Sequence, residues 1–417
     1  MAAPLRVVIW NANGLSNHKL ELHTFLTMYK IDIALVSETH FTSRSVFKIP
    51  HYTVYRNIYA DDTAHGGPAV IIRSSIRQHE LPHHQSAKIQ ATTVQLEAHP
   101  RPMTISAIYC PPRHTISTED YTMLIRYLGA RFQIGGDWNA KHTAWGPRLT
   151  TPKGRNLLHA IAGHNCHYLS TGEPTYWPTD LTKLPELLDF IVTRNIPANY
   201  TQLESAFEFS SDHTTVIATL SATTIPKPPT PKLTTSHTNW DMFRAYINER
   251  INLHLCIKKP TELDDATHYF TILIQAAAWH STPTPPARMD PTTNTPLHIR
   301  ELIAAKRRSR SRWQRSRNQG DRITYNRLRR QLQTALRNVN NITFEHYLTT
   351  LTPSDNTLWK ATQRLKRPQT SIPPIRKTDR NLAKSNEEKP QHLRTTSNEC
   401  SLPTLSSSLP MLQSPPS

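Results

Sequence analysis

Two short apolar runs within the first forty residues constrain the fold of this chain more than any other feature. Residues 5–10 and 31–37 are mostly aliphatic and β-branched, as strands buried on both faces are. The segment between them, residues 16–29, repeats its apolar side chains at helical spacing. Strand, helix and strand in this order predict an α/β fold with a buried sheet.

Polar side chains follow both runs. Asn11 and Asn13 come directly after the first run, in a turn-forming stretch, and Glu38 comes directly after the second. Open α/β folds bind their ligands at the edge where such strands end. The sequence therefore predicts a binding site with amide and carboxylate groups at this edge.

Two later strands are expected to contribute in the same way. Tyr109 ends the apolar run 103–109, and the prolines after it stop that strand because proline cannot donate to a β-ladder. Asp137 and Asn139 follow the run 132–136. Residues two apart on an extended segment point the same way, so both could reach one metal-bound phosphate.

Three further candidates lie near the end of the region whose pattern is globular. Asp189 stands inside an apolar run, where an acid is unfavourable unless it is paired. Asp212 and His213 stand directly before the β-branched segment 214–217. An Asp-His pair alone is a weak signal, but a histidine with a buried aspartate nearby suits an oriented imidazole.

The combined residue types favour phosphodiester chemistry. Carboxylate and amide oxygens suit Mg²⁺, with Mn²⁺ as a substitute that the same ligands could accept. Hydrolysis of a phosphodiester needs a metal ion on the charged oxygens, a group that orients water, and donors for the developing charge. The sequence offers a candidate for each of these functions.

Six motifs resemble, in order and spacing, the endonuclease/exonuclease/phosphatase superfamily, which includes pancreatic-type deoxyribonuclease and the apurinic/apyrimidinic endonucleases. The motifs are Trp10-Asn11, Ser37-Glu38-Thr39, Tyr109-Cys110-Pro111, Gly136-Asp137-Trp138-Asn139, Leu188-Asp189-Phe190 and Ser211-Asp212-His213. The resemblance covers residues 5–221. It implies a four-layer α/β/β/α sandwich of two mixed sheets, and a mainly helical basic region follows it.

A closer resemblance is to the endonuclease domain of Jockey-type non-LTR retrotransposons. It rests on residues 139–142 with Trp145-Gly146, and on residues 151–155. Residues 239–244 and the arginine-rich helix beyond them look like the segment between endonuclease and polymerase in those elements. The resemblance implies Mg²⁺-dependent nicking of one DNA strand, which leaves a 3′-OH that can prime reverse transcription.

The resemblance also implies which residues hold the metal and the substrate. Glu38 would be the principal metal ligand, helped by Asn11, and Asp212 would lie near the metal. Asn13 stands where repair endonucleases carry aspartate, which removes one acidic charge and points to the Jockey-like branch. The expected substrate contacts in this domain are Asn13, Lys141, His142 and Trp145.

The same resemblance implies the catalytic roles. Asp137 would activate or orient the attacking water, and Asn139 would hold the phosphate with Tyr109 nearby. His213 would stabilise charge on the scissile phosphate, and Asp189 would orient its ring. No motif position is lost, so an intact catalytic set is expected.

The charge balance predicts a polyanionic partner. The chain has a formal net charge of +18. One long basic helix is expected over residues 296–351, and its segment 306–337 holds twelve Lys or Arg against one acid, Asp321. Like charges at helical spacing repel one another, so DNA, or the element's own RNA, explains the segment better than a solvated face does. The expected contacts on this helix are Arg307, Arg308 and Arg310.

Composition divides the chain into four segments. The predicted segments are an endonuclease domain at 1–222, a Pro/Thr linker at 223–238, a helical basic nucleic-acid-binding region at 239–367 and a disordered tail at 368–417. No polymerase motif follows the linker, so a truncated, partial or domesticated copy of an element protein is expected.

The expected location is intracellular. The four cysteines lie far apart without a CxxC pair, which is typical of a reducing compartment. No apolar run is long enough for a signal peptide or a membrane span. We expect cytoplasmic synthesis, action in the nucleus and no membrane partner, and the sequence leaves the oligomeric state open.

Several alternatives stay open at this stage. The motifs also fit a repair endonuclease that acts at abasic sites, and a lipid or inositol phosphatase fits less well because the basic region favours DNA. A degenerate copy could bind nucleic acid through residues 306–337 without catalysis. Residues 59–62 match the YxDD signature of reverse transcriptases, but only 58 residues precede them, so a charged hairpin turn is the better interpretation.

Overall fold

The computed structural model describes residues 4–366, with gaps at 60–61, 83, 85, 87, 100, 197–200, 221–222, 225–232, 235–237, 253–258, 284–294 and 354–355. Beyond residue 366 it describes only residues 375–376 and 382–383. The predicted linker 223–238 and the predicted tail 368–417 therefore lie largely outside the described residues, as do two of the four residues at 59–62.

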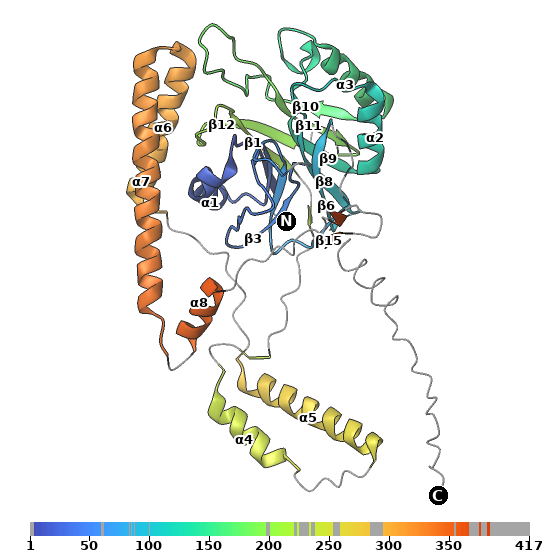
Figure 1. Cartoon of the computed structure of the whole chain (residues 1–417), viewed down its shortest axis with the longest axis vertical. Helices are drawn as coiled ribbons and strands as arrows, with labels where there is room; N and C mark the ends of the chain where they lie inside the picture. The colour runs from blue at the N-terminus through green and yellow to red at the C-terminus, as the bar shows by residue number, and fades with distance from the viewer. Residues whose placement is uncertain are drawn as a thin grey trace, which may run out of the picture. The chain divides into compact units, whose positions relative to one another are not determined.

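Two six-stranded sheets form the framework of the first two hundred residues (Figure 1). The strands of the first sheet are β1 (Leu5–Asn11), β2 (Ile33–Ser37), β3 (Tyr52–Arg56), β4 (Ala69–Arg73), β12 (Thr201–Ala206) and β13 (Thr215–Leu220). Those of the second are β5 (Gln78–Glu80), β6 (Gln90–Leu96), β8 (Met103–Tyr109), β9 (Phe132–Asp137), β10 (His167–Leu169) and β11 (Asp189–Arg194). The two-stranded pairs are β7 (Ala98–His99) with β14 (Thr223–Thr224), and β15 (Ile375–Arg376) with β16 (Leu382–Ala383).

Each large sheet is mixed because one strand pair in it is parallel. The strand orders are β12-β13-β1-β2-β4-β3 and β10-β11-β9-β8-β6-β5. β1 runs parallel to β2 and pairs Asn11 with Ser37, and β8 runs parallel to β9 and pairs Tyr109 with Asp137. All other neighbours in the two sheets are antiparallel. The parallel pairs bring the polar residues that end their strands to one edge of each sheet.

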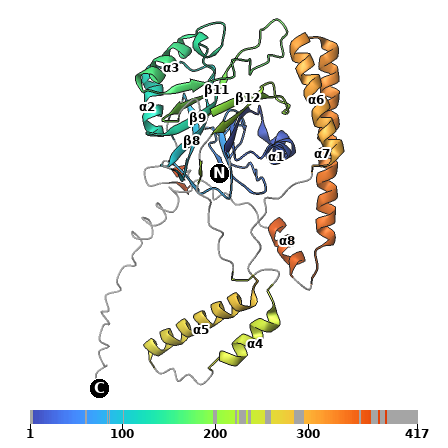
Figure 2. The same ribbon diagram turned by 180° about the vertical axis from the view of Figure 1, so that it is seen from behind.

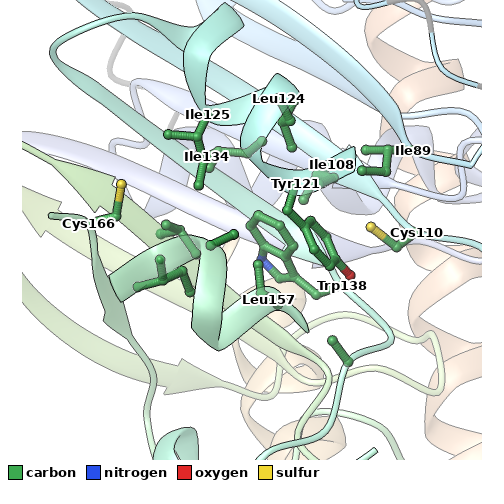
Figure 3. Close-up of a cluster of buried hydrophobic side chains, with 14 of the residues drawn as sticks. Ile89, Ile108, Cys110, Tyr121, Leu124, Ile125, Ile134, Trp138, Leu157 and Cys166 are labelled. Carbon is green, nitrogen blue, oxygen red and sulfur yellow. The ribbon is translucent and has the colours of Figure 1, made fainter. Parts of the chain in front are cut away.

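Three layers of buried side chains confirm the predicted four-layer α/β/β/α sandwich. The helices of the sandwich are α1 (Lys19–Met28), α2 (Thr118–Leu128) and α3 (Pro152–Gly163), with short 3-10 turns at Leu15–His18 and Thr143–Trp145. The central layer lies between the sheets and contains Ile9 and Ile105. Phe25 of α1 packs on the outer face of the first sheet, and α2 and α3 cover the second (Figures 1 and 2). Figure 3 shows this last layer around Trp138.

β9 contains two consecutive glycines, and the second has no room for a side chain. A Cβ atom on Gly136 would lie 2.2 Å from the Ile108 carbonyl oxygen and 2.7 Å from Ser37 Oγ. We expect Gly136→Ala to destabilise the fold by about 1–3 kcal/mol, because β8 and β9 must move apart. Urea unfolding followed by far-UV circular dichroism measures the effect. Gly163→Ala is the control because nothing lies within 4 Å of its Cβ position; equal midpoints for both variants would contradict the prediction.

The arginine-rich segment is a helical hairpin, so the predicted single helix over 296–351 is wrong. The hairpin consists of α6 (Leu297–Ser316) and α7 (Gln319–Thr349). Arg317 interrupts the helix with a left-handed φ of 53°, and Asn318 begins the next one by accepting a hydrogen bond from Gly320 N at 2.7 Å. Apolar contacts between the helices involve Ile299, Leu332 and Leu336, and Trp313 stacks on Tyr325. The apolar side chains that sequence reasoning assigned to one helix therefore face each other across two.

The remaining helices are α4 (Trp240–Arg250), α5 (Pro260–Ser281) and α8 (Thr357–Lys366). α4 and α5 pack against each other. By spatial contacts, residues 1–42 and 47–344 form one compact unit, and residues 43–46 with 345–417 form another. The predicted boundaries at 222, 238 and 367 stay predictions. No helix in the described part of the chain is long and apolar enough to cross a membrane.

Candidate active site

The side-chain amide of Asn11 connects the two sheets at the edge where their strands end. Its Nδ2 donates to Glu38 Oε1 at 3.0 Å and to Asp137 Oδ2 at 2.9 Å. These residues come from the end of β1, the residue after β2 and the end of β9. Asn11 is fully buried, so it fixes the two carboxylates relative to each other.

The Glu38 carboxylate is the more accessible of the two. Its side chain is 21% exposed, and its Oε2 lies 3.6 Å from His40 Nε2. Burial raises the pKa of Glu38, but hydrogen bonds from His40 and Asn11 outweigh burial and hold that pKa below its ordinary value. An ionised, accessible carboxylate fits a hard divalent cation.

Asp137 is buried and holds the loop that follows it. Its Oδ1 accepts a hydrogen bond from Asn139 N at 2.9 Å, and its own N–H donates to Ser37 Oγ at 3.1 Å. Burial and the nearby charge of Asp189 raise the pKa of Asp137 to about 8. A positive charge close to this carboxylate, from a cation or from His213, favours its ionised form.

His213 and Asp189 form a buried pair in which His213 Nδ1 lies 2.6 Å from Asp189 Oδ2. Thr175 supports the pair, because its Oγ1 accepts hydrogen bonds from the N–H groups of Leu188 and Asp189, each at 3.0 Å. Burial lowers the pKa of His213, but the Asp189 carboxylate outweighs burial and raises that pKa to about 10. The imidazole therefore carries a positive charge at neutral pH, and its Nε2–H can donate.

Two groups of side chains offer ligand atoms for a cation, and they differ in donor type. Among the described residues, Asp137, Asp189 and His213 offer ligand atoms within 4.8 Å of one another. A protonated imidazole, however, has no free lone pair for a metal. The oxygen donors around Glu38 fit a hard cation better than this group does.

Two of the remaining predicted residues, Asn13 and Asp212, contact each other, and the third is Tyr109. Asn13 Nδ2 donates to Asp212 Oδ1 at 3.4 Å in an exposed position. Tyr109 is almost buried, and burial together with the carboxylates of Glu38 and Asp137 raises its pKa above the ordinary value. The phenol therefore keeps its proton and can donate to a phosphate oxygen.

Sharp backbone turns place these side chains. Asn13, Glu38, His40 and Asn139 have φ values of 45°, 50°, 55° and 45°, in the left-handed region. Asparagine and histidine are the more frequent non-glycine residues in this region, whereas glutamate rarely adopts it. Such conformations persist only where the surrounding structure imposes them, and they gather at functional sites.

Trp145 is a core residue, which corrects the expectation that it contacts DNA. Its side chain is 2% exposed and stacks on Phe190 with 5.0 Å between ring centroids. Its indole N–H donates to the Ala140 carbonyl at 3.1 Å. Burial of the ring and of its only polar atom leaves nothing for a substrate to contact.

Lys141 and His142 remain partly exposed beside it. Lys141 Nζ pairs with Glu186 Oε1 at 3.2 Å, and His142 Nδ1 accepts a hydrogen bond from Ala144 N at 3.0 Å. Both residues have structural partners, and both keep surface that a substrate could reach.

The three arginines predicted to bind nucleic acid differ in exposure. Arg307 and Arg308 are exposed, but Arg310 is only 1% exposed. Arg310 Nη2 donates to the carbonyl oxygens of Ser211 and His213, at 3.1 and 2.8 Å. This corrects the expectation for Arg310, because its guanidinium is turned into the protein.

Sequence reasoning missed two hydroxyl groups that brace the site. One is Thr175, described above. The other is Ser211, whose Oγ accepts from Trp10 Nε1 at 2.7 Å and donates to the Asn11 carbonyl at 2.8 Å. Ser211 lies inside a recognised motif and Thr175 lies near one. The spacing of serine and threonine along a sequence, however, does not show whether a hydroxyl group bonds within the protein or to solvent.

The fold and the cluster of strand-end residues define a nuclease-like domain of the endonuclease/exonuclease/phosphatase type. A family model described as "Endonuclease-reverse transcriptase" matches residues 103–217. The chain is 33% identical over 393 residues to "Probable RNA-directed DNA polymerase from transposon BS" of Drosophila melanogaster, which covers 92% of this chain and 43% of that protein. It is 29% identical over 390 residues to "RNA-directed DNA polymerase from mobile element jockey" of Drosophila funebris, with coverages of 92% and 43%.

Solved structures give further matches. The endonuclease domain of TRAS1, a telomere-specific non-LTR retrotransposon, is 21% identical with a TM-score of 0.44, covering 52% of this chain and 98% of that one. The Xenopus laevis APE2 catalytic domain is 16% identical with a TM-score of 0.42, covering 54% and 94%. The resemblance inferred from the motifs is confirmed: residues 103–217 match an endonuclease-reverse transcriptase family model, and most of the chain is similar to RNA-directed DNA polymerases of Drosophila mobile elements, jockey among them. It spans about two-fifths of the length of the curated relatives it matches.

Proposed function

We propose that this chain is a divalent-metal-dependent endonuclease that nicks one strand of DNA as the target-site step of a non-LTR retrotransposon. The observation that carries the proposal is the Asn11 amide, which holds Glu38 and Asp137 together at the joined edge of the two sheets. The buried His213–Asp189 pair stands beside Asp137. A metal-ligand carboxylate, a second acid and a charged imidazole are the groups that phosphodiester hydrolysis requires.

Each group has a task that its surroundings suit. Glu38, with Asn11 and Asp212, would hold the ion, which supplies positive charge to the phosphate oxygens when it is bound. Asp137 accepts a proton from the attacking water or orients it. Asn139 and Tyr109 donate hydrogen bonds to the phosphate.

His213 completes this set as a cationic donor to the phosphate, because the Asp189 carboxylate keeps its imidazole charged and fixes its ring. A donor already charged and oriented in the buried site need not reorganise as negative charge develops on the phosphate. Its Nε2–H is therefore the group to which we assign stabilisation of that charge.

The exposed face of α6 is the proposed binding surface for the DNA backbone. Arg307, Arg308, Arg312 and Arg315 line an open hollow of about 590 Å³ together with Phe207, Ser311 and Ser316. No acid lines this hollow. Guanidinium groups bind phosphates in bidentate geometry, so the hollow suits a nucleic-acid backbone. Asn13, Lys141 and His142 are further proposed contacts, and the element's own RNA is a second candidate partner for the same arginines.

Plasmid nicking tests the proposed activity. The full chain is expected to relax supercoiled plasmid with Mg²⁺ or Mn²⁺ and to stop when a chelator is added. Glu38→Gln should lower the rate at least about 100-fold, because the neutral amide binds the cation weakly and several kcal/mol of charge stabilisation disappear.

The matched control is Glu119→Gln on α2, whose carboxylate is 68% exposed. Absence of relaxed circles from the wild type, or equal rates for Glu38→Gln and wild type, would overturn the proposal. A parallel assay on a duplex with one abasic site separates target-site nicking from repair, since a repair enzyme strongly prefers the damaged duplex.

A further inference from the structure

Helix α6 lies against the loop that carries two of the proposed active-site residues. This loop, residues 208–214, makes up most of the connection from β12 to β13 and includes Asp212 and His213. Lys306, Arg310 and Gln314 contact it from one side of α6, where residues four apart share a face. Their exposures are 0%, 1% and 4%, so all three polar side chains are buried in the contact.

The Arg310 guanidinium donates hydrogen bonds to three backbone carbonyl groups of the loop. Its Nη1 donates to the Phe209 carbonyl, and its Nη2 donates to those of Ser211 at 3.1 Å and His213 at 2.8 Å. Buried carbonyl groups need donors, and a guanidinium supplies several in a fixed plane. One side chain thus sets the path of the backbone from residue 209 to residue 213.

The other two side chains fasten the ends of the same loop. Lys306 Nζ donates to the Glu208 carbonyl and lies 3.2 Å from Ser210 Oγ. Gln314 Nε2 lies 3.3 Å from Thr214 Oγ1. Successive turns of α6 therefore hold the loop from its first residue to its last.

We propose that α6 completes the nuclease site and that Arg310 is a positioning residue, which fixes the 209–213 backbone so that the His213 imidazole meets Asp189 and the phosphate. This inference rests on the proposed function. It assigns different roles to two sets of side chains on one helix: the buried Lys306, Arg310 and Gln314 hold the loop, and exposed arginines such as Arg308 and Arg312 line the hollow, while Arg307 also pairs with Glu208 at 3.3 Å. It also means that the active site includes a residue nearly one hundred positions beyond the last catalytic motif.

Steady-state nicking by the full chain tests the assignment. Arg310→Ala is expected to lower kcat about 10- to 100-fold, because a small displacement of a catalytic group has effects of this size. KM for plasmid should change less than about twofold, since the DNA-facing arginines are unaltered. Millimolar guanidinium added to Arg310→Ala should restore part of kcat by occupying the vacated space, and Arg310→Lys should fall between wild type and alanine.

The matched control is Arg126→Ala, since Arg126 is a 68% exposed arginine on α2. It should retain wild-type kcat and show no response to guanidinium. Wild-type kcat in Arg310→Ala, a change confined to KM, or a folded Arg310→Ala that guanidinium does not rescue would each overturn the proposal.

A second readout does not depend on catalysis. The short His213–Asp189 hydrogen bond should give a downfield proton signal in NMR, assigned by its loss in His213→Asn. We expect Arg310→Ala and Arg310→Lys to shift or remove this signal, and an unchanged signal would contradict the positioning role. If the wild type does not nick DNA but Arg310→Lys alters the signal, the proposed function fails while the positioning of His213 stands.

Discussion

His213→Ala is expected to lower the rate of DNA nicking about 10³-fold while leaving the chain folded and able to bind DNA. The imidazole is buried, and the Asp189 carboxylate, 2.6 Å from Nδ1, raises its pKa to about 10. In the proposed function it therefore serves at neutral pH as a fixed cationic donor toward the phosphate rather than as a base. Truncation removes both the charge and the donor from a buried position, where each is most effective.

Single-turnover nicking measures this loss without interference from product release. His159→Ala is the matched control, because His159 is an exposed histidine on α3. Asp189→Asn should have an effect of similar direction, since the asparagine neither charges the ring nor fixes its tautomer. Rates within about threefold of wild type for His213→Ala would remove His213 from the chemistry.

Lys306→Met is expected to destabilise the chain by about 3–5 kcal/mol, the second large effect. Lys306 Nζ is fully buried and contacts the Glu21 carboxylate of α1. His18 and Ser210 also reach this carboxylate, at 3.0 and 2.7 Å. Without the Lys306 ammonium, the ionised Glu21 carboxylate stays buried with only its hydrogen bonds to offset the loss of hydration. A single buried charge of this kind is far less favourable than replacement of both charged partners.

The double variant Lys306→Met with Glu21→Gln provides the control, and it should recover most of the lost stability in urea unfolding. The pH dependence gives a second check. Burial raises the pKa of Glu21, but Lys306 and His18 outweigh burial and hold that pKa below its ordinary value of 4.5. The contribution of Glu21 is thus present above pH 4.5 and lost as the pH falls below it, and Lys306→Met should weaken this acid dependence. Additive effects of the two substitutions would contradict the ion pair.

The two sheets and the clustering of most candidate site residues could be predicted from the sequence because they depend on local signals. Apolar runs marked the strands, and the polar residues that ended them, such as Asn11, Glu38 and Asp137, had to meet once the strands paired. The six motifs then located Asp189 and His213. The positions of residues at strand ends are predictable in this way because strand pairing fixes where the backbone of each strand ends.

The packing of α6 against the loop 208–214 could not be predicted, because its pattern of basic residues is the same as that of a solvated or DNA-binding helix. Lys306 and Arg310 stand among exposed arginines in the sequence, and only the folded structure shows which of these cations are buried. Glu21, the partner of Lys306, belongs to a helix nearly three hundred residues earlier. The prediction that Trp145 contacts DNA was wrong for a different reason. A tryptophan in a sequence motif suggests a surface that binds DNA, but Ala140 and Phe190 pack around this ring and bury it.

The left-handed backbone at Glu38 and His40 has a consequence for how such domains decay in genomes. A non-glycine residue in this conformation lowers stability by about 1 kcal/mol, which glycine would recover. In a copy released from selection for cleavage, drift toward glycine at these two positions is therefore tolerated or even favoured by folding. If the proposed function holds, we therefore expect both side chains to be retained in copies of the domain that remain under selection for cleavage.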